Sequence, residues 1–111
     1  MTIRLESKES TIPGAGMGLF TKDFIPANSI LFPSFSWNGQ MNGKFDQDYD
    51  QNAKNRMVNH SEMPNLTSFW DGAVMWKKTK RDIKAGEELF SDYRHTMSIL
   101  PYPPSKSFLD F

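Results

Sequence analysis

Two short motifs contain most of the residues of this chain that could do chemistry. Asn59, His60 and Ser61 form the first motif, and the second, GEELFSDY, runs from Gly86 to Tyr93. An amide, an imidazole and a phenol both donate and accept hydrogen bonds, which suits the binding and orientation of a ligand. Each motif alone is ordinary, because a His beside an Asn is usually a satisfied polar pair and a Tyr usually packs with its hydroxyl in water.

A third motif lies upstream, where Gly14, Gly16 and Gly18 follow Pro13. Three glycines in five positions predict an exposed loop whose backbone adopts positive φ and can lie close to a ligand. The motif is not the dinucleotide fingerprint, since no helix is expected after it, and it lacks the Lys of a phosphate loop. Backbone contact with a ligand remains as its function, and a plain turn between strands is the alternative.

In this order and at this spacing, the three motifs resemble the SET domain family of protein-lysine methyltransferases. The patterns are G-x-G, R-x-x-N-H-S-x-x-P-N and R-x-I-x-x-G-E-E-L-x-x-D-Y, and the resemblance extends roughly from Leu5 to Tyr93. The matching residues are Gly14, Gly16, Arg56, Asn59, His60, Ser61, Pro64, Asn65, Arg81, Ile83, Gly86, Glu87, Glu88, Leu89, Asp92 and Tyr93.

The resemblance implies a mainly β protein with the SET-domain, β-clip-like fold of several small curved sheets and one or two short helices. In that fold the C-terminal segment forms a pseudoknot by passing through a loop formed earlier in the chain, which is a rare arrangement. The threading would bring Tyr93 beside Asn59 and His60. We expect one domain over residues 1–111, in which the tail 94–111 closes the substrate channel.

The resemblance also implies S-adenosylmethionine as cofactor and a role for each residue of the site. The backbone at Ala15, Gly16 and Met17 would hold the methionine part of the cofactor. The Asn59 side chain would hydrogen-bond the cofactor, the His60 main chain would read the adenine edge, and Tyr93 would be the catalytic residue at the junction with the lysine channel. Arg56 and Glu88 are expected to be structural.

Methyl transfer to lysine requires an uncharged amine in line with the methyl group and the sulfur. A free lysine has a pKa of ~10.4, so holding it neutral near pH 7 costs about 4–5 kcal/mol. An apolar channel and the adjacent sulfonium both favour the neutral amine, so no general base is needed. The role expected for Tyr93 is orientation, with its hydroxyl dipole against the reacting groups.

Composition excludes several other classes of protein. The 13 basic and 13 acidic residues balance, so we expect no direct binding of nucleic acid and no polybasic membrane anchor. With no Cys there is no disulfide and no thiolate metal site, and two scattered histidines predict no metal. The sequence shows neither a signal peptide nor a membrane span, so we expect an intracellular, soluble protein, nuclear if its substrate is a histone.

Local patterns predict short strands and tight turns along most of the chain. A four-residue spacing of apolar positions favours one helix between Phe45 and Met57, and Asp71-Gly72 predicts a type I′ hairpin. The segment 24–31 resembles the segment 82–89 without a gap. The similarity is either chance or the sign of two comparable β units that face each other.

The chain departs from the family pattern at its C-terminus, where many members carry a Cys-rich, zinc-binding segment. The aromatic tail ending at Phe111 is the expected substitute for closing the channel. Trp37 and Tyr49 are candidates for channel walls, with ordinary packing as the alternative.

The substrate expected is a lysine in a basic protein tail, such as a histone, and a homodimer that completes the substrate groove is possible. The cluster of Asp46, Asp48 and Asp50 would attract such a tail, unless it is only a solvated face. A small β interaction module without catalysis, and a SET-like fold that only binds cofactor or peptide, are the competing interpretations.

Overall fold

The structure is a computed structural model that describes residues 2–40, 42 and 45–99. The described residues are mainly β, as predicted, and contain three short helices where one or two were expected. The elements are β1 (Leu5–Glu9), β2 (Met17–Thr21), β3 (Ile30–Trp37), α1 (Phe45–Asp48), β4 (Tyr49–Gln51), α2 (Ala53–Arg56), β5 (Asn59–His60), β6 (Leu66–Trp70), β7 (Val74–Thr79), β8 (Phe90–Ser91) and α3 (Tyr93–Ser98).

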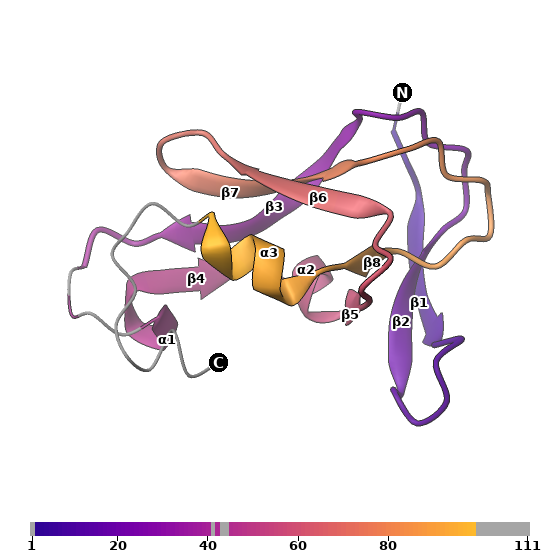
Figure 1. The fold of residues 1–111 in the computed structure, drawn as a ribbon, viewed down its shortest axis with the longest axis horizontal. Coiled ribbons are helices and arrows are strands. Elements are labelled where there is room, and N and C mark those ends of the chain that lie inside the picture. Colours follow the sequence, from indigo (N-terminus) through magenta and orange to yellow (C-terminus); the bar gives the residue numbers. More distant parts are fainter. Residues whose placement is uncertain (1, 41, 43–44, 100–111) are drawn as a thin grey trace.

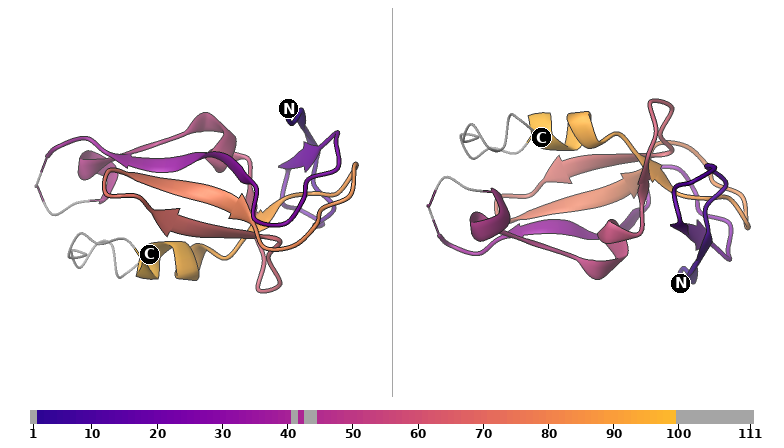
Figure 2. Two further views of the ribbon diagram at one scale, coloured as in Figure 1. Left: turned by 90° about the horizontal axis from the view of Figure 1, so that it is seen from above. Right: turned by 90° about the horizontal axis from the view of Figure 1, so that it is seen from below.

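Three small sheets make up the fold. The largest is antiparallel with the strand order β4-β3-β7-β6, while β1 and β2 form an antiparallel hairpin and β5 pairs with β8 in parallel. Figure 1 shows the β1–β2 hairpin at the opposite end of the molecule from α1, and Figure 2 shows the same separation from above and below. The β5–β8 pair therefore lies between the N-terminal hairpin and the large sheet (Figure 1).

The apolar core is divided between two clusters. One contains Leu19, Ile25, Phe32, Val58, Leu66, Ile83 and Leu89, and the other contains Phe35, Tyr49 and Met75. Each fully buried aliphatic side chain contributes about 1.5–3 kcal/mol to stability through removal from water. Because residues from both halves of the sequence meet in the first cluster, the core joins the two ends of the chain.

The similarity between segments 24–31 and 82–89 is a structural repeat. Ile25 and Ile83, which occupy matching positions, pair with each other through two N–H···O bonds of 2.8 Å. The surrounding bonds also match: Asn28 N donates to Thr79 O at 3.0 Å, and Gly86 N donates to Thr21 O at 2.7 Å. The two units face each other about an approximate twofold axis, so the interpretation as chance is wrong.

The loop after β5 encloses the late segment that leads to Tyr93. Ser61 N donates to Ser91 O at 3.1 Å, next to the parallel β5–β8 pairing. On the far side of this loop the Asn65 side chain donates to Glu88 O and accepts from Phe90 N, both at 2.8 Å. This is the crossing of chain segments that the predicted pseudoknot requires.

Three local predictions differ from the structure. The segment 45–57 is not one helix, because the strand β4 separates α1 from α2, and the Asn52 side chain caps α2 by accepting from Lys54 N at 2.9 Å. The apolar spacing of four that suggested one helix therefore arises from three short elements. In the hairpin, Asp71 N donates to Val74 O, so the tip is Gly72-Ala73 and not Asp71-Gly72.

The hairpin is not of type I′ either, since a I′ turn needs positive φ at both central residues. Gly72 has φ 109°, but Ala73 does not have a positive φ. No helix in the part of the chain that the structure describes has the length and apolar character needed to cross a bilayer.

Candidate functional site

A buried carboxylate, that of Glu88, connects the N-terminal hairpin to the late segment. Glu88 is 5% exposed and accepts hydrogen bonds from Ser10 Oγ at 2.8 Å, from Thr11 N at 2.8 Å and from Thr11 Oγ1 at 2.6 Å. Asn59 Nδ2 donates to the same carboxylate at 3.1 Å. Burial by itself raises the pKa of Glu88, but the hydrogen bonds from Thr11, Asn59 and Ser10 outweigh it and leave the pKa below its usual value.

The Asn59 side chain bridges this carboxylate and the glycine loop. Its Nδ2 donates one bond to Glu88 Oε2 and one to Met17 O, each at 3.1 Å. Both amide hydrogens are therefore used within the protein. The carbonyl oxygen Oδ1 accepts no hydrogen bond from the described residues, so this acceptor remains available to a ligand.

The glycine loop presents bare backbone next to Asn59. Gly14 and Gly16 have φ of 78° and 77°, a region that side-chain-bearing residues rarely adopt, and a Cβ at either position would meet nothing within 4 Å. Gly18 is different, because a Cβ there would lie 2.4 Å from Glu88 Oε2. Its missing side chain lets the carboxylate approach the hairpin, so Gly18 belongs to the Glu88 cluster and not to the exposed loop.

Tyr93 is the first residue of α3, which begins there because Asp92 caps it. The Asp92 carboxylate accepts from Arg94 N at 3.0 Å and from His95 N at 3.5 Å. The Tyr93 hydroxyl donates to Val58 O at 2.5 Å, and partial burial raises the pKa of this phenol. The phenol proton is thus directed at the main chain before Asn59, and the oxygen lone pairs are left for another partner.

His60 lies directly against Tyr93, as the sequence predicted. Their ring centroids are 5.1 Å apart, and Tyr93 N donates to His60 Nδ1 at 3.1 Å. Because Nδ1 accepts this bond it carries no proton, so its 4.0 Å separation from an Asp92 carboxylate oxygen is not an ion pair. The structure therefore brings together Asn59, His60, Tyr93 and, through Asn59, the loop carbonyl of Met17. Ala15 and Gly16 are exposed on that loop.

A cavity of about 190 Å³ opens beside Tyr93. It is lined by Phe35, Gln51, Asn55, Arg56, Lys77, Tyr93, Thr96 and Met97. Two of these side chains are basic, and none of the lining residues is acidic. The cavity is large enough for an extended aliphatic side chain, and Arg56 lies at its rim.

The wall of this cavity includes a buried lysine, Lys77 on β7. Its Nζ donates to Ser68 Oγ at 2.7 Å, to Ser91 Oγ at 2.6 Å and to Thr96 Oγ1 at 2.8 Å. These hydroxyls come from β6, β8 and α3, so the ammonium connects α3 to the sheet. Burial lowers the pKa of Lys77 to about 8, against a smaller opposing effect of Asp92.

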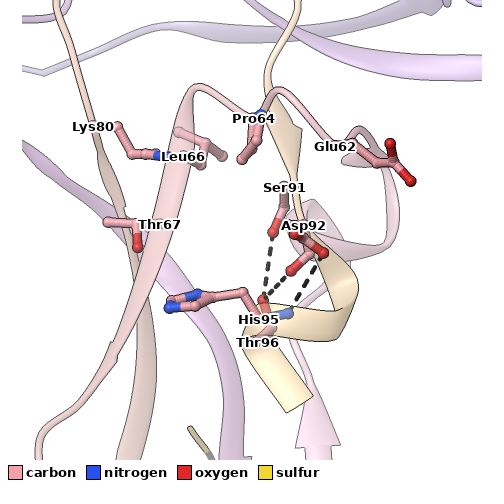
Figure 3. Close-up of a pocket in the computed structure, with 9 residues that line it drawn as sticks. All are labelled: Glu62, Pro64, Leu66, Thr67, Lys80, Ser91, Asp92, His95 and Thr96. Carbon is pink, nitrogen blue, oxygen red and sulfur yellow. Dashed lines mark hydrogen bonds between the residues drawn. The ribbon is translucent and has the colours of Figure 1, made fainter. Parts of the chain in front are cut away.

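A second cavity, of about 180 Å³, lies on the other side of Ser91 and Thr96. Figure 3 shows its lining residues: the His95 ring of α3 extends toward Thr67 of β6, while Asp92, the N-cap of α3, is turned toward the helix itself. Ser91 and Thr96 line this cavity, and Lys77 and Thr96 line the first. The Lys77 cluster is therefore the partition between the two cavities.

Two predicted substrate contacts, the Tyr49 channel wall and the acidic patch, are wrong, whereas the Trp37 contact stays a prediction because that side chain is 40% exposed. Tyr49 is 5% exposed and packs edge-on against Trp70 at 6.3 Å between ring centroids, and neither Trp37 nor Tyr49 lines the two cavities described above. Asp48 is fully buried and accepts from Asn42 N at 3.0 Å, so it cannot form one exposed acidic patch with Asp50. Ordinary packing explains Tyr49, and a hydrogen bond inside the fold explains Asp48.

Other predictions lie outside what the structure describes. The side chain of Asp46 and residues 100–111, which include most of the tail expected to close the channel, are in this group. Among the residues that are described, no three His, Cys, Asp or Glu side chains are grouped to hold a metal ion.

Comparison with known proteins identifies the family. The sequence model of the SET domain matches residues 34–94, which is more than half of the chain, so the chain belongs to the SET domain family. Members of this family are typically protein-lysine methyltransferases. None of the curated proteins matches the chain.

Solved structures share the fold at low sequence identity. A candidate histone methyltransferase of Plasmodium falciparum is 16% identical with a TM-score of 0.61, and the match covers 84% of this chain and 95% of that one. Polycomb Repressive Complex 2 of Chaetomium thermophilum, bound to GSK126, gives 17% identity and a TM-score of 0.66 over 91% of this chain and 17% of that one.

The same complex bound to S-adenosylmethionine gives 18% identity and a TM-score of 0.65 over 91% of this chain. This chain spans only 16% of that protein's length. These likenesses confirm the predicted fold class and do not assign an activity to this chain.

The arrangement fits a ligand of the predicted kind. The free Oδ1 of Asn59, the open backbone at Gly14 and Gly16, and the half-exposed ring of Tyr93 adjoin one another through the Asn59–Met17 and Tyr93–His60 bonds. Sequence reasoning missed the cluster of Ser10, Thr11 and Gly18 around Glu88. It also missed the buried position of Lys77. Lys77 stands two residues from both Met75 and Thr79, which are buried, and alternation along a strand predicts that it is buried with them.

Proposed function

We propose that this chain is an S-adenosylmethionine-dependent protein-lysine N-methyltransferase. The observation that carries the proposal is the meeting of Tyr93 with Asn59 and His60, next to a cavity that an aliphatic chain would fill. Residues remote in sequence come together here, and membership of the SET domain family supports the same conclusion.

In this proposal the bound cofactor supplies a methyl group already activated by its sulfonium. The protein contributes position. The backbone of Ala15, Gly16 and Met17 borders the methionine part, and Asn59 keeps that loop in place while offering Oδ1. The main chain at His60 borders the adenine.

Tyr93 orients the reacting groups. Because its hydroxyl proton is donated to Val58 O, the oxygen can accept a hydrogen bond from the incoming amine and present partial negative charge to the transferring methyl group. Such charge is effective only if the ring is held in position before the reaction. The hydroxyl bond to Val58 O holds the tip of the ring, and the bond from Tyr93 N to His60 holds the backbone that carries it.

The proposed substrate is a lysine in a basic protein such as a histone. The aliphatic stem of that lysine would occupy the cavity beside Tyr93. An intracellular protein that is nuclear when it acts on histones, and a homodimer completing the groove, remain predictions that follow from the same proposal.

The decisive experiment is methyl transfer from labelled S-adenosylmethionine to a histone mixture and to a cell lysate, followed by mass spectrometry of the labelled proteins. Tyr93→Phe should lower the transfer rate at least about tenfold while the fold and cofactor affinity are kept. Equal turnover of the variant and the parent would remove Tyr93 from the mechanism. Cofactor binding without transfer by the parent would leave a binding module.

A second variant tests the cofactor site. Asn59→Ala should weaken S-adenosylmethionine binding by roughly 1–3 kcal/mol, because a hydrogen-bond acceptor for the ligand is lost and the loop is released. Titration calorimetry measures the affinity, and Asn52→Ala, at the cap of α2, is the matched control. Unchanged affinity in Asn59→Ala would contradict the assignment.

A further inference from the structure

Lys77 is the most unusual ionisable residue of the described chain. It is 2% exposed, and all its hydrogen-bond partners are neutral hydroxyls. None of the described carboxylates forms an ion pair with it. An ammonium group buried without an ion-pair partner is costly, so its presence at this position calls for an explanation beyond packing.

The charge of Lys77 lies in the wall of the cavity beside Tyr93. Arg56, at the exposed rim, is the second cation of this cavity, and the remaining lining side chains are neutral. Arg56 is in contact with water, which screens its field, whereas Lys77 is shielded from solvent. A cationic occupant of the cavity would therefore be repelled mainly by Lys77.

We propose that the buried ammonium of Lys77 makes the cavity beside Tyr93 selective for an uncharged amine, and that Lys77 is a specificity-determining residue of this site. The inference rests on the proposed methyl transfer and assigns to Lys77 the discrimination between the reactive amine and its unreactive protonated form. The selection is made by the chain itself, in addition to any effect of the bound cofactor.

The charged groups around Lys77 support this role. The strands β3 and β6, which flank β7, contribute no ionisable side chains. α2 contributes Arg56, and the cap of α3 is Asp92, whose effect on Lys77 is weaker than that of burial. His95, with Glu62 and Lys80, lines the second cavity, beyond the partition formed by Ser91 and Thr96. The cavity beside Tyr93 thus experiences the Lys77 charge with little compensation.

A like charge at the wall lowers the pKa of an amine that enters, so a larger fraction of the substrate is reactive at neutral pH. In a partly buried site, repulsion between two nearby cations lowers the pKa of the entering amine by roughly one unit. Because the pKa of Lys77 itself is about 8, its charge acts only below that pH. Removing the charge should therefore move the part of the acidic limb of the pH–rate profile below about pH 8 to higher pH by about one unit and leave the rate above pH 8 unchanged.

The experiment measures kcat/KM for methyl transfer between pH 6 and 10 in the parent, Lys77→Met, Lys77→Arg and Lys78→Met. Lys77→Met leaves Ser68, Ser91 and Thr96 free to bond among themselves, since Ser68 and Thr96 are already 3.2 Å apart. We expect the limb to shift in Lys77→Met, and to stay at the parent's pH in Lys77→Arg and in Lys78→Met, whose side chain lies over Phe69. NMR of lysine Nζ-labelled parent protein should show Lys77 charged at pH 7.

Any one of three results would overturn the proposal. A lower rate at every pH with the limb unmoved would make Lys77 merely structural, and a neutral Lys77 at pH 7 would remove the repelling charge. Inhibition of the parent by acetate that disappears in Lys77→Met would mean that the cavity takes an anion. A parent that transfers methyl groups but shows one of these results retains the proposed function, whereas a parent that transfers none loses both.

Discussion

The two copies of the internal repeat have matching backbone pairs and different surroundings. The match extends to residues 19–32 and 77–90, because the pair Phe20–Glu88 corresponds to the pair Ile30–Lys78. In the first copy, position 30 is an isoleucine that is 60% exposed; in the second, the matching position is Glu88, which is 5% exposed. Leu19 lies in the apolar core, and its counterpart Lys77 lies in a cluster of hydroxyls. The backbone of the unit is therefore compatible with very different side chains.

The difference comes from what packs against each copy. The second copy is covered by the N-terminal hairpin through Ser10 and Thr11 and by β5 through Asn59, and it continues into Tyr93. The first copy continues into β3 of the large sheet and ends there among apolar side chains. The candidate site thus forms on one copy only, because only that copy is followed by a segment that crosses the loop after β5.

The largest contrast is expected between Glu88→Ala and Ile30→Ala. Glu88→Ala leaves the Thr11 N–H and the donors of Ser10 and Asn59 without their acceptor, at a cost of about 4 kcal/mol in the free energy of unfolding. Ile30→Ala, at an exposed position, should cost less than about 1 kcal/mol. Urea denaturation of both variants measures the difference. Equal losses would mean that the two copies are equally important for stability.

The next contrast concerns Lys77 and Leu19 as a function of pH. The pKa of Lys77 is about 8 in the folded protein and near 10.5 when unfolded. Between these values the unfolded state binds more protons, so the free energy of unfolding should rise with pH by about 3 kcal/mol. The rise begins at pH 8 and is complete above pH 10.5. Lys77→Met should abolish it, and Leu19→Met should retain it, as measured by denaturation at each pH.

The smallest contrast concerns the turns of the two copies. Gly86 has φ 92° and Asn28 has φ 62° at the matching position. Gly86→Ala should cost about 1 kcal/mol, since a Cβ disfavours this region, and Asn28→Gly should change stability by less than about 0.5 kcal/mol. Thermal unfolding of the two variants tests this. A larger loss in Asn28→Gly would show that the asparagine side chain, and not its backbone, supports its turn.

The sequence predicted the parts of this molecule that depend on contiguous motifs. The glycine loop, the meeting of Asn59, His60 and Tyr93, and the fold class were accessible because their residues stand at fixed spacings that resemble one family. The repeat was visible for the same reason, since Ile25 and Ile83 occupy equal positions in similar segments.

The parts that were missed depend on contacts between distant segments. The hydroxyl partners of Glu88 are 77 and 78 residues away, and no local pattern indicates which Ser or Thr will meet a carboxylate. The helix α3 is six residues long, and its start depends on the Asp92 cap and on its connection to Lys77, so apolar periodicity could not reveal it. The acidic cluster was misread because Asp48 is satisfied inside the fold.

The bonds of Glu88 to Ser10 and Thr11 also constrain the order of events during synthesis. A chain leaving the ribosome exposes its glycine loop first, and that loop lacks its anchor until residue 88 has been added. The hairpin can form early, but the proposed ligand site is assembled only at the end. A product released before this point would resemble the finished protein in its first strands and would be unable to hold a ligand.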